Sequence, residues 1–157
     1  MWEALEQSAW VKSLGETGWL YAGITVIHFL TMFWCIGSMA IVDLRVVGVA
    51  ARRQKVEELA EHLFPWAWTG FALAIISGFL MFTTSAGDLA PDPVFQIKVA
   101  LILISAVFAF LVQRGVPKWA QAPKIPTGAK ILAVVSLLLW IATILCSSEI
   151  PSREGLG

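Results

Sequence analysis

The chain has 157 residues, of which 58% are hydrophobic and 14% charged, and its formal net charge is zero. Ordinary soluble domains carry about 25% charged residues, so this composition indicates a membrane protein that lives in a lipid bilayer. The balanced charge argues against a nucleic-acid partner, and two cysteines outside any CxxC pair exclude a disulfide framework.

Residues 1–17 are expected to form a weakly amphipathic segment at the membrane interface. The first expected transmembrane helix covers residues 18–45. It has no charged residue between Gly18 and Val42. This uncharged stretch is long enough to cross the core of a bilayer, which takes about 20 apolar residues. His28 lies inside this span, where a polar side chain is by default a candidate functional group.

Four soft side chains share one face of this helix. At about 100° per residue they fall within roughly 60° of arc, and they are His28, Met32, Cys35 and Met39. Copper(I) favours imidazole, thioether and thiolate ligands, so the stripe is a candidate copper(I) path. The simpler interpretation is helix packing, with His28 hydrogen-bonded across the interface.

Residues 46–62 mix basic, acidic and apolar side chains, and we expect a helical connector along the membrane. The second helix is expected at 63–84, with Pro65 in its first turn. Its small residues Gly70, Ala74 and Gly78 recur every four positions. Such a stripe lets another helix or a flat ligand approach the backbone.

A Gly-, Pro- and Asp-rich loop separates this helix from a third at 94–113, and a loop with three prolines leads to a fourth at 131–146. Four spans with short connections predict one all-α domain, a four-helix transmembrane bundle. Eight of the eleven Lys and Arg residues fall in the first and third loops, counting Arg45 at the end of the first helix. We therefore expect those loops in the cytoplasm and both termini outside.

Three segments together resemble a known family: IHFLTMFWCIGSMAIVDLR, PWAWTGFALAIISGFLMF and DPVFQIKVAL. The sequence resembles an uncharacterised bacterial family of four-helix membrane proteins, distantly similar to copper-resistance D proteins and four-helix b-type cytochromes. The family pattern falls on His28, Asp43-Leu44-Arg45, Pro65-Trp66-x-Trp68-x-Gly70-Phe71 and Lys98. The resemblance implies a multi-pass protein of the bacterial inner membrane and implies no function.

Family members often carry a histidine near the end of the third helix, where this chain has Gln113. Bis-histidine haem b needs two histidines at similar depth. The second histidine, His62, differs from His28 in depth by roughly 25 Å, so one porphyrin cannot bridge them. Haem b would instead use His28 alone, His28 with Met81, or His28 with a ligand from a partner chain, and Gly78 would leave room for the ring.

The remaining candidates sit at the span boundaries. Asp43 and Arg45 are expected in a boundary ion pair with the connector or the third loop. Lys98 is expected to reach outward to an acidic group, namely Asp88, Asp92 or Glu149. Trp66 and Trp68 are expected in an aromatic belt, and with Phe71 they could border a lipid or quinone groove.

No nucleophile–base pair, phosphate loop or zinc spacing is recognisable, so the sequence does not predict an enzyme. The favoured function is a small accessory or assembly subunit that contacts other membrane subunits, or copies of itself, through its helices. The alternative is a haem b electron carrier centred on His28, and a third, weaker one is copper(I) handling along the stripe.

Overall fold

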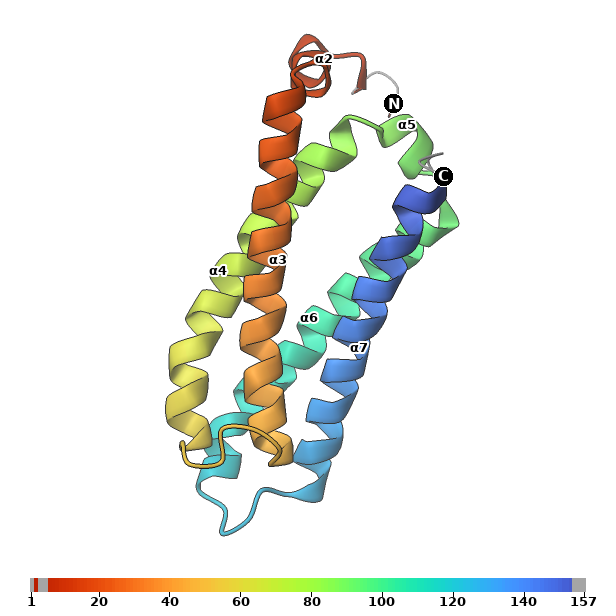
Figure 1. Cartoon of the computed structure of the whole chain (residues 1–157). Helices are drawn as coiled ribbons and strands as arrows, with labels where there is room; N and C mark the ends of the chain where they lie inside the picture. Colours follow the sequence, from red (N-terminus) through yellow and green to blue (C-terminus); the bar gives the residue numbers. More distant parts are fainter. Residues whose placement is uncertain (1, 3–5, 154–157) are drawn as a thin grey trace.

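The computed structural model describes residue 2 and residues 6–153 of the chain, with side chains described as far as residue 147. Four long helices run up and down in sequence order (Figure 1), α3 (Gly18–Val47), α4 (Val56–Thr83), α6 (Pro93–Ala120) and α7 (Thr127–Arg153). Within the described residues, these four helices are long and apolar enough to cross a membrane. The predicted all-α four-helix transmembrane bundle is confirmed.

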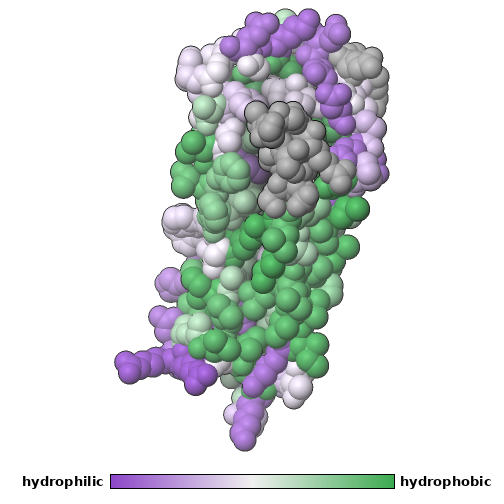
Figure 2. Space-filling view, turned by 45° about the vertical axis from the view of Figure 1, so that its right-hand side comes forward, coloured by the Kyte–Doolittle hydropathy of each residue, from purple (hydrophilic) through white to green (hydrophobic). Residues whose placement is uncertain are grey.

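Two short helices lie at one end of the bundle, α2 (Ala9–Glu16) before α3 and α5 (Ala86–Leu89) between α4 and α6. We call this the α5 end. The opposite end, here the basic end, holds the loops 48–55 and 121–126 with Arg52, Arg53, Lys55 and Lys124. Figure 2 shows an apolar band over the helices between hydrophilic residues at both ends, as expected of a chain in a bilayer.

Three helices are several residues longer than the sequence predicts, and α7 (Thr127–Arg153) exceeds its predicted range, 131–146, at both ends. α4 begins at Val56, so residues 56–62 are its first turns rather than a connector, and Pro65 lies inside it rather than in the first turn. α6 continues to Ala120, past Pro117. The cause is packing, because Val56, Ala60 and Phe64 are buried together with Val112 and Val116 in one apolar cluster. Burial of this face outweighs the local cost of a proline.

The helices associate as two close pairs, α3 with α4 and α6 with α7, and contacts between α3 and α7 join the pairs. The apolar core lies toward the basic end, where α3, α4, α6 and α7 all contribute to one cluster. A second cluster around Cys35, Met39, Ala67, Ala109 and Trp140 lies next to it, nearer the middle of the spans. Toward the α5 end, the buried residues of the long helices include small polar ones, Ser77, Thr83, Ser105 and Thr143.

Candidate functional site

His28 lies in the contact between α3 and α4. Its Nδ1 is 3.0 Å from the main-chain oxygen of Ala74 and 3.1 Å from Ser77 Oγ. A carbonyl oxygen can only accept, so Nδ1 carries the hydrogen and donates it. In the neutral imidazole the other nitrogen, Nε2, is then an acceptor. His28 therefore ties α3 to α4 through one ring nitrogen and keeps the other free for a proton or a ligand.

Two glycines of the predicted small-residue stripe make this contact possible. A Cβ on Gly78 would lie 3.0 Å from His28 Cε1 and 3.4 Å from Nδ1. A Cβ on Gly70 would lie 3.1 Å from the main-chain oxygen of Thr31 and 3.2 Å from the main-chain nitrogen of Cys35. The stripe therefore faces α3, and the space at Gly78 is filled by the imidazole of His28.

The other residues of the stripe that begins at His28 differ in their surroundings. Cys35 and Met39 are 2% and 1% exposed and pack in the apolar cluster with Trp140, whereas Met32 is partly buried. Met81 is also partly buried, about one turn beyond Gly78 on α4. Within the described residues, no group of three or more His, Cys, Asp and Glu side chains could hold a metal ion.

The two charged residues at the end of α3 point to different partners. Arg45 Nε donates to the main-chain oxygen of Gln54 at 2.7 Å and so fixes α3 to the loop 48–55. Asp43 is 2% exposed and lies near Ser136 of α7. In the described part of the chain, the one ion pair is between Lys55 and Glu58, and Asp43 forms no ion pair. Asp43 thus faces the interior rather than the connector or the third loop.

Lys98 also lies on the inner side of its helix. It is half-buried on α6 and lies near His28 of α3 and Cys146 of α7. Asp92, one of its expected partners, instead caps α6 by accepting from the main-chain nitrogen of Val94 at 3.0 Å. The side chain of Glu149, another expected partner, lies outside the described side chains. The α5 half of the interior therefore holds both His28 and Lys98.

The two tryptophans of the Pro-Trp-x-Trp motif have different environments. Trp66 is 59% exposed and lies against Trp34 of α3, also exposed, with ring centroids 5.9 Å apart. Trp68 faces inward, and its Nε1 donates to Gln113 Oε1 at 2.7 Å. Phe71 packs edge-on against Trp68. This link between α4 and α6 was not predicted from the sequence. The signal that could have indicated it is the side-chain amide of Gln113 within an apolar helix.

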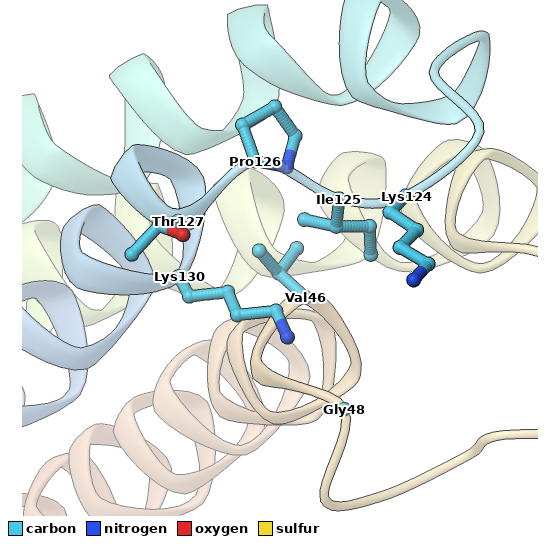
Figure 3. A pocket seen from close by; sticks show the side chains of 7 residues that line it. All are labelled: Val46, Gly48, Lys124, Ile125, Pro126, Thr127 and Lys130. Atoms are coloured by element: carbon cyan, nitrogen blue, oxygen red, sulfur yellow. The ribbon is translucent and has the colours of Figure 1, made fainter.

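A cavity of about 540 Å³ opens at the basic end (Figure 3) and was also not predicted. It lies between the end of α3 and the start of α7. Its lining comprises Val46, Gly48, Lys124, Ile125, Pro126, Thr127 and Lys130. Gly48 ends α3 with φ +93, a left-handed conformation that glycine adopts readily.

Comparison with known proteins gives one match. The model of a family described as a family of unknown function (DUF6644) matches residues 3–150. No curated protein and no solved structure matches the chain.

Proposed function

The chain belongs to this family of unknown function, and we propose that it is an accessory or assembly subunit of the bacterial inner membrane that works through helix–helix contacts. The observation that carries the proposal is the use made of His28. His28 is the side chain within the apolar span of α3 that can ionise near neutral pH, and its imidazole is hydrogen-bonded to Ala74 and Ser77 of α4. An intramembrane polar group used in this way supports a role in helix association.

The outer surface of the α3–α4 pair is the proposed contact for a partner subunit or a second copy. Trp34 and Trp66 lie side by side there, 57% and 59% exposed. Aromatic side chains that bury a large area with few rotatable bonds are enriched where proteins bind one another. On this proposal the basic end faces the cytoplasm and both termini face outward, as the distribution of lysine and arginine indicates.

Site-specific photo-cross-linking in native membranes tests the proposal. A photoreactive residue at position 34 or 66 should give a discrete cross-linked band, and two differently tagged copies of the chain would tell self-association from a foreign partner. Leu103 of α6 is 60% exposed and is the matched lipid-facing control. Position 34 or 66 giving only the diffuse lipid adducts of position 103 would refute the proposed contact.

A second candidate, a haem b electron carrier, is favoured by one feature of the same histidine. Histidines that bind metals commonly donate their other ring N–H to a carbonyl, as Nδ1 of His28 donates to Ala74. Nε2 would then be the iron ligand. The imidazole already occupies the space beside Gly78, so a porphyrin would have to enter by another face.

Absorption spectroscopy separates the two functions. A haem protein purified from haem-supplemented cells would show a Soret band that His28→Ala abolishes. His62→Ala, the control, should leave that band intact, because His62 is exposed and its Nδ1 donates to the main-chain oxygen of Glu58 in its own helix. A wild-type protein without a Soret band would leave the accessory role as the surviving proposal.

A further inference from the structure

Three buried polar atoms of α3 and α7 have no hydrogen-bond partner. They are Asp43 Oδ2, Ser136 Oγ and Trp140 Nε1, and within the described side chains they are the buried nitrogen and oxygen atoms left unpaired. Their side chains are 2%, 0% and 4% exposed. Buried polar groups in native proteins are nearly always paired, so each unpaired one needs an explanation.

The three side chains lie on facing turns of α3 and α7. Ser136 lies close to the Asp43 carboxyl, although the two do not meet in the geometry of a hydrogen bond. Trp140 is one turn from Ser136 on α7, and it packs in the same cluster as Met39, one turn from Asp43 on α3. Two consecutive turns of α3 therefore face two consecutive turns of α7.

The hydroxyl of Ser136 does not form the main-chain hydrogen bond that other buried hydroxyls of this interior form. Ser105 and Thr143 of the same interior donate to the carbonyls of Leu101 and Leu139, four residues earlier, which is the usual solution in apolar surroundings. Ser136 makes no such bond. Its hydroxyl is available to the space beside Asp43.

An ionised Asp43 would have no counter-ion in this position. On its own helix the guanidinium of Arg45 is turned to Gln54. On α7, Ser136 lies near the Asp43 carboxyl. Lys130 of the same helix is exposed at the basic-end cavity. The neighbouring cluster contributed by α4 and α6 is apolar. A buried, unpaired carboxylate is so costly that the group takes up a proton or a cation instead.

The unpaired atoms are complementary to a water molecule. Trp140 Nε1 can only donate, Asp43 Oδ2 of a protonated carboxyl can accept, and the hydroxyl of Ser136 can do either. A buried water typically makes about three such bonds. Val46, one turn beyond Asp43 on α3, lines the open cavity at the basic end, which brings solvent within a turn of the site.

We propose that Asp43, Ser136 and Trp140 form an internal site that binds one proton and one water molecule. The carboxyl of Asp43 holds the proton, and the water accepts from Trp140 Nε1, donates to Asp43 Oδ2 and bonds to Ser136 Oγ. The site needs no partner subunit, so it stands or falls independently of the proposed accessory role.

Infrared spectroscopy of the full-length protein in lipid nanodiscs tests the site. At neutral pH the wild type should show the C=O stretch of a protonated carboxyl, shifted in D₂O. Asp43→Asn, which keeps the shape of the side chain, should remove that band, whereas Asp88→Asn, at an exposed carboxyl of α5, should leave it. Ser136→Ala and Trp140→Phe should each shift its frequency without removing it, because each takes away one bond to the water.

Two results would refute the bound proton, and a third would refute the bound water. One is a wild-type spectrum with no protonated carboxyl at neutral pH. This measurement uses only the wild-type protein, so it does not depend on whether any variant folds. A carboxylate signal that responds to sodium instead would assign the site to a metal cation. The other is a band that persists in Asp43→Asn. A band that neither Ser136→Ala nor Trp140→Phe shifts would exclude the bound water.

Discussion

The packing of α4 on α3 predicts a strict order among alanine substitutions of three glycines. At Gly70 the new Cβ would meet main-chain atoms at 3.1 and 3.2 Å, well inside van der Waals contact, and main chain in a helix cannot move aside alone. Overpacking of this kind costs about 1–3 kcal/mol, against about 1 kcal/mol gained from helix propensity. Gly70→Ala should therefore lower the free energy of unfolding by up to about 2 kcal/mol.

Alanine substitutions at Gly78 and Gly37 provide the comparison for the loss of stability expected at Gly70. At Gly78 the Cβ would press on the His28 ring at 3.0 Å, and the ring can yield only by lengthening its bond to Ala74, worth about 0.5–1.5 kcal/mol. At Gly37 of α3 nothing lies within 4 Å of the added atom. Gly37→Ala should then be neutral or stabilising by at most about 1 kcal/mol, with Gly78→Ala between the two.

Reversible unfolding in detergent, followed by far-ultraviolet circular dichroism, measures all three. The reasoning also predicts coupling, because Gly78→Ala in a His28→Ala background has no ring to displace and should resemble Gly37→Ala. Equal stability of Gly70→Ala and Gly37→Ala would refute the close contact. Equal effects of Gly78→Ala with and without His28 would refute the role of the ring.

Three further predictions concern orientation and local contacts. A reporter active only in the cytoplasm should be silent when fused after Gly157 and active when inserted at Pro123, and the reverse would invert the bundle. Asp92→Ala should lower stability by about 1 kcal/mol through loss of the α6 cap, whereas Asp92→Asn should not, in thermal melts. Trp68→Phe should cost about 1–3 kcal/mol by leaving Gln113 unpaired, and Gln113→Leu in that background should recover part of it in the same melts.

The sequence was sufficient to predict four spans because uncharged runs of this length have few alternatives. It also predicted that the Gly70–Gly78 stripe permits close approach, since small residues at helical spacing define a face. Helix ends were less predictable, because the burial of Phe64 and Val116 carries α4 and α6 past their prolines. The inward position of Asp43 was not predictable, because it depends on how α3 is rotated against α7, which only the assembled bundle decides.

The uneven core explains why a histidine lies in the α5 half of α3. Both apolar clusters lie toward the basic end or the middle of the spans, and in lipid, apolar surface alone gives helices little reason to associate. Toward the α5 end the buried residues are small and hydroxylated, as at Ser77 and Ser105. There the bond from His28 to Ala74, closed over Gly78, holds α3 and α4 together where bulky apolar packing is lacking. Removing it should loosen the α5 half first, so hydrogen exchange in His28→Ala should rise around Ala74 before it rises around Phe64.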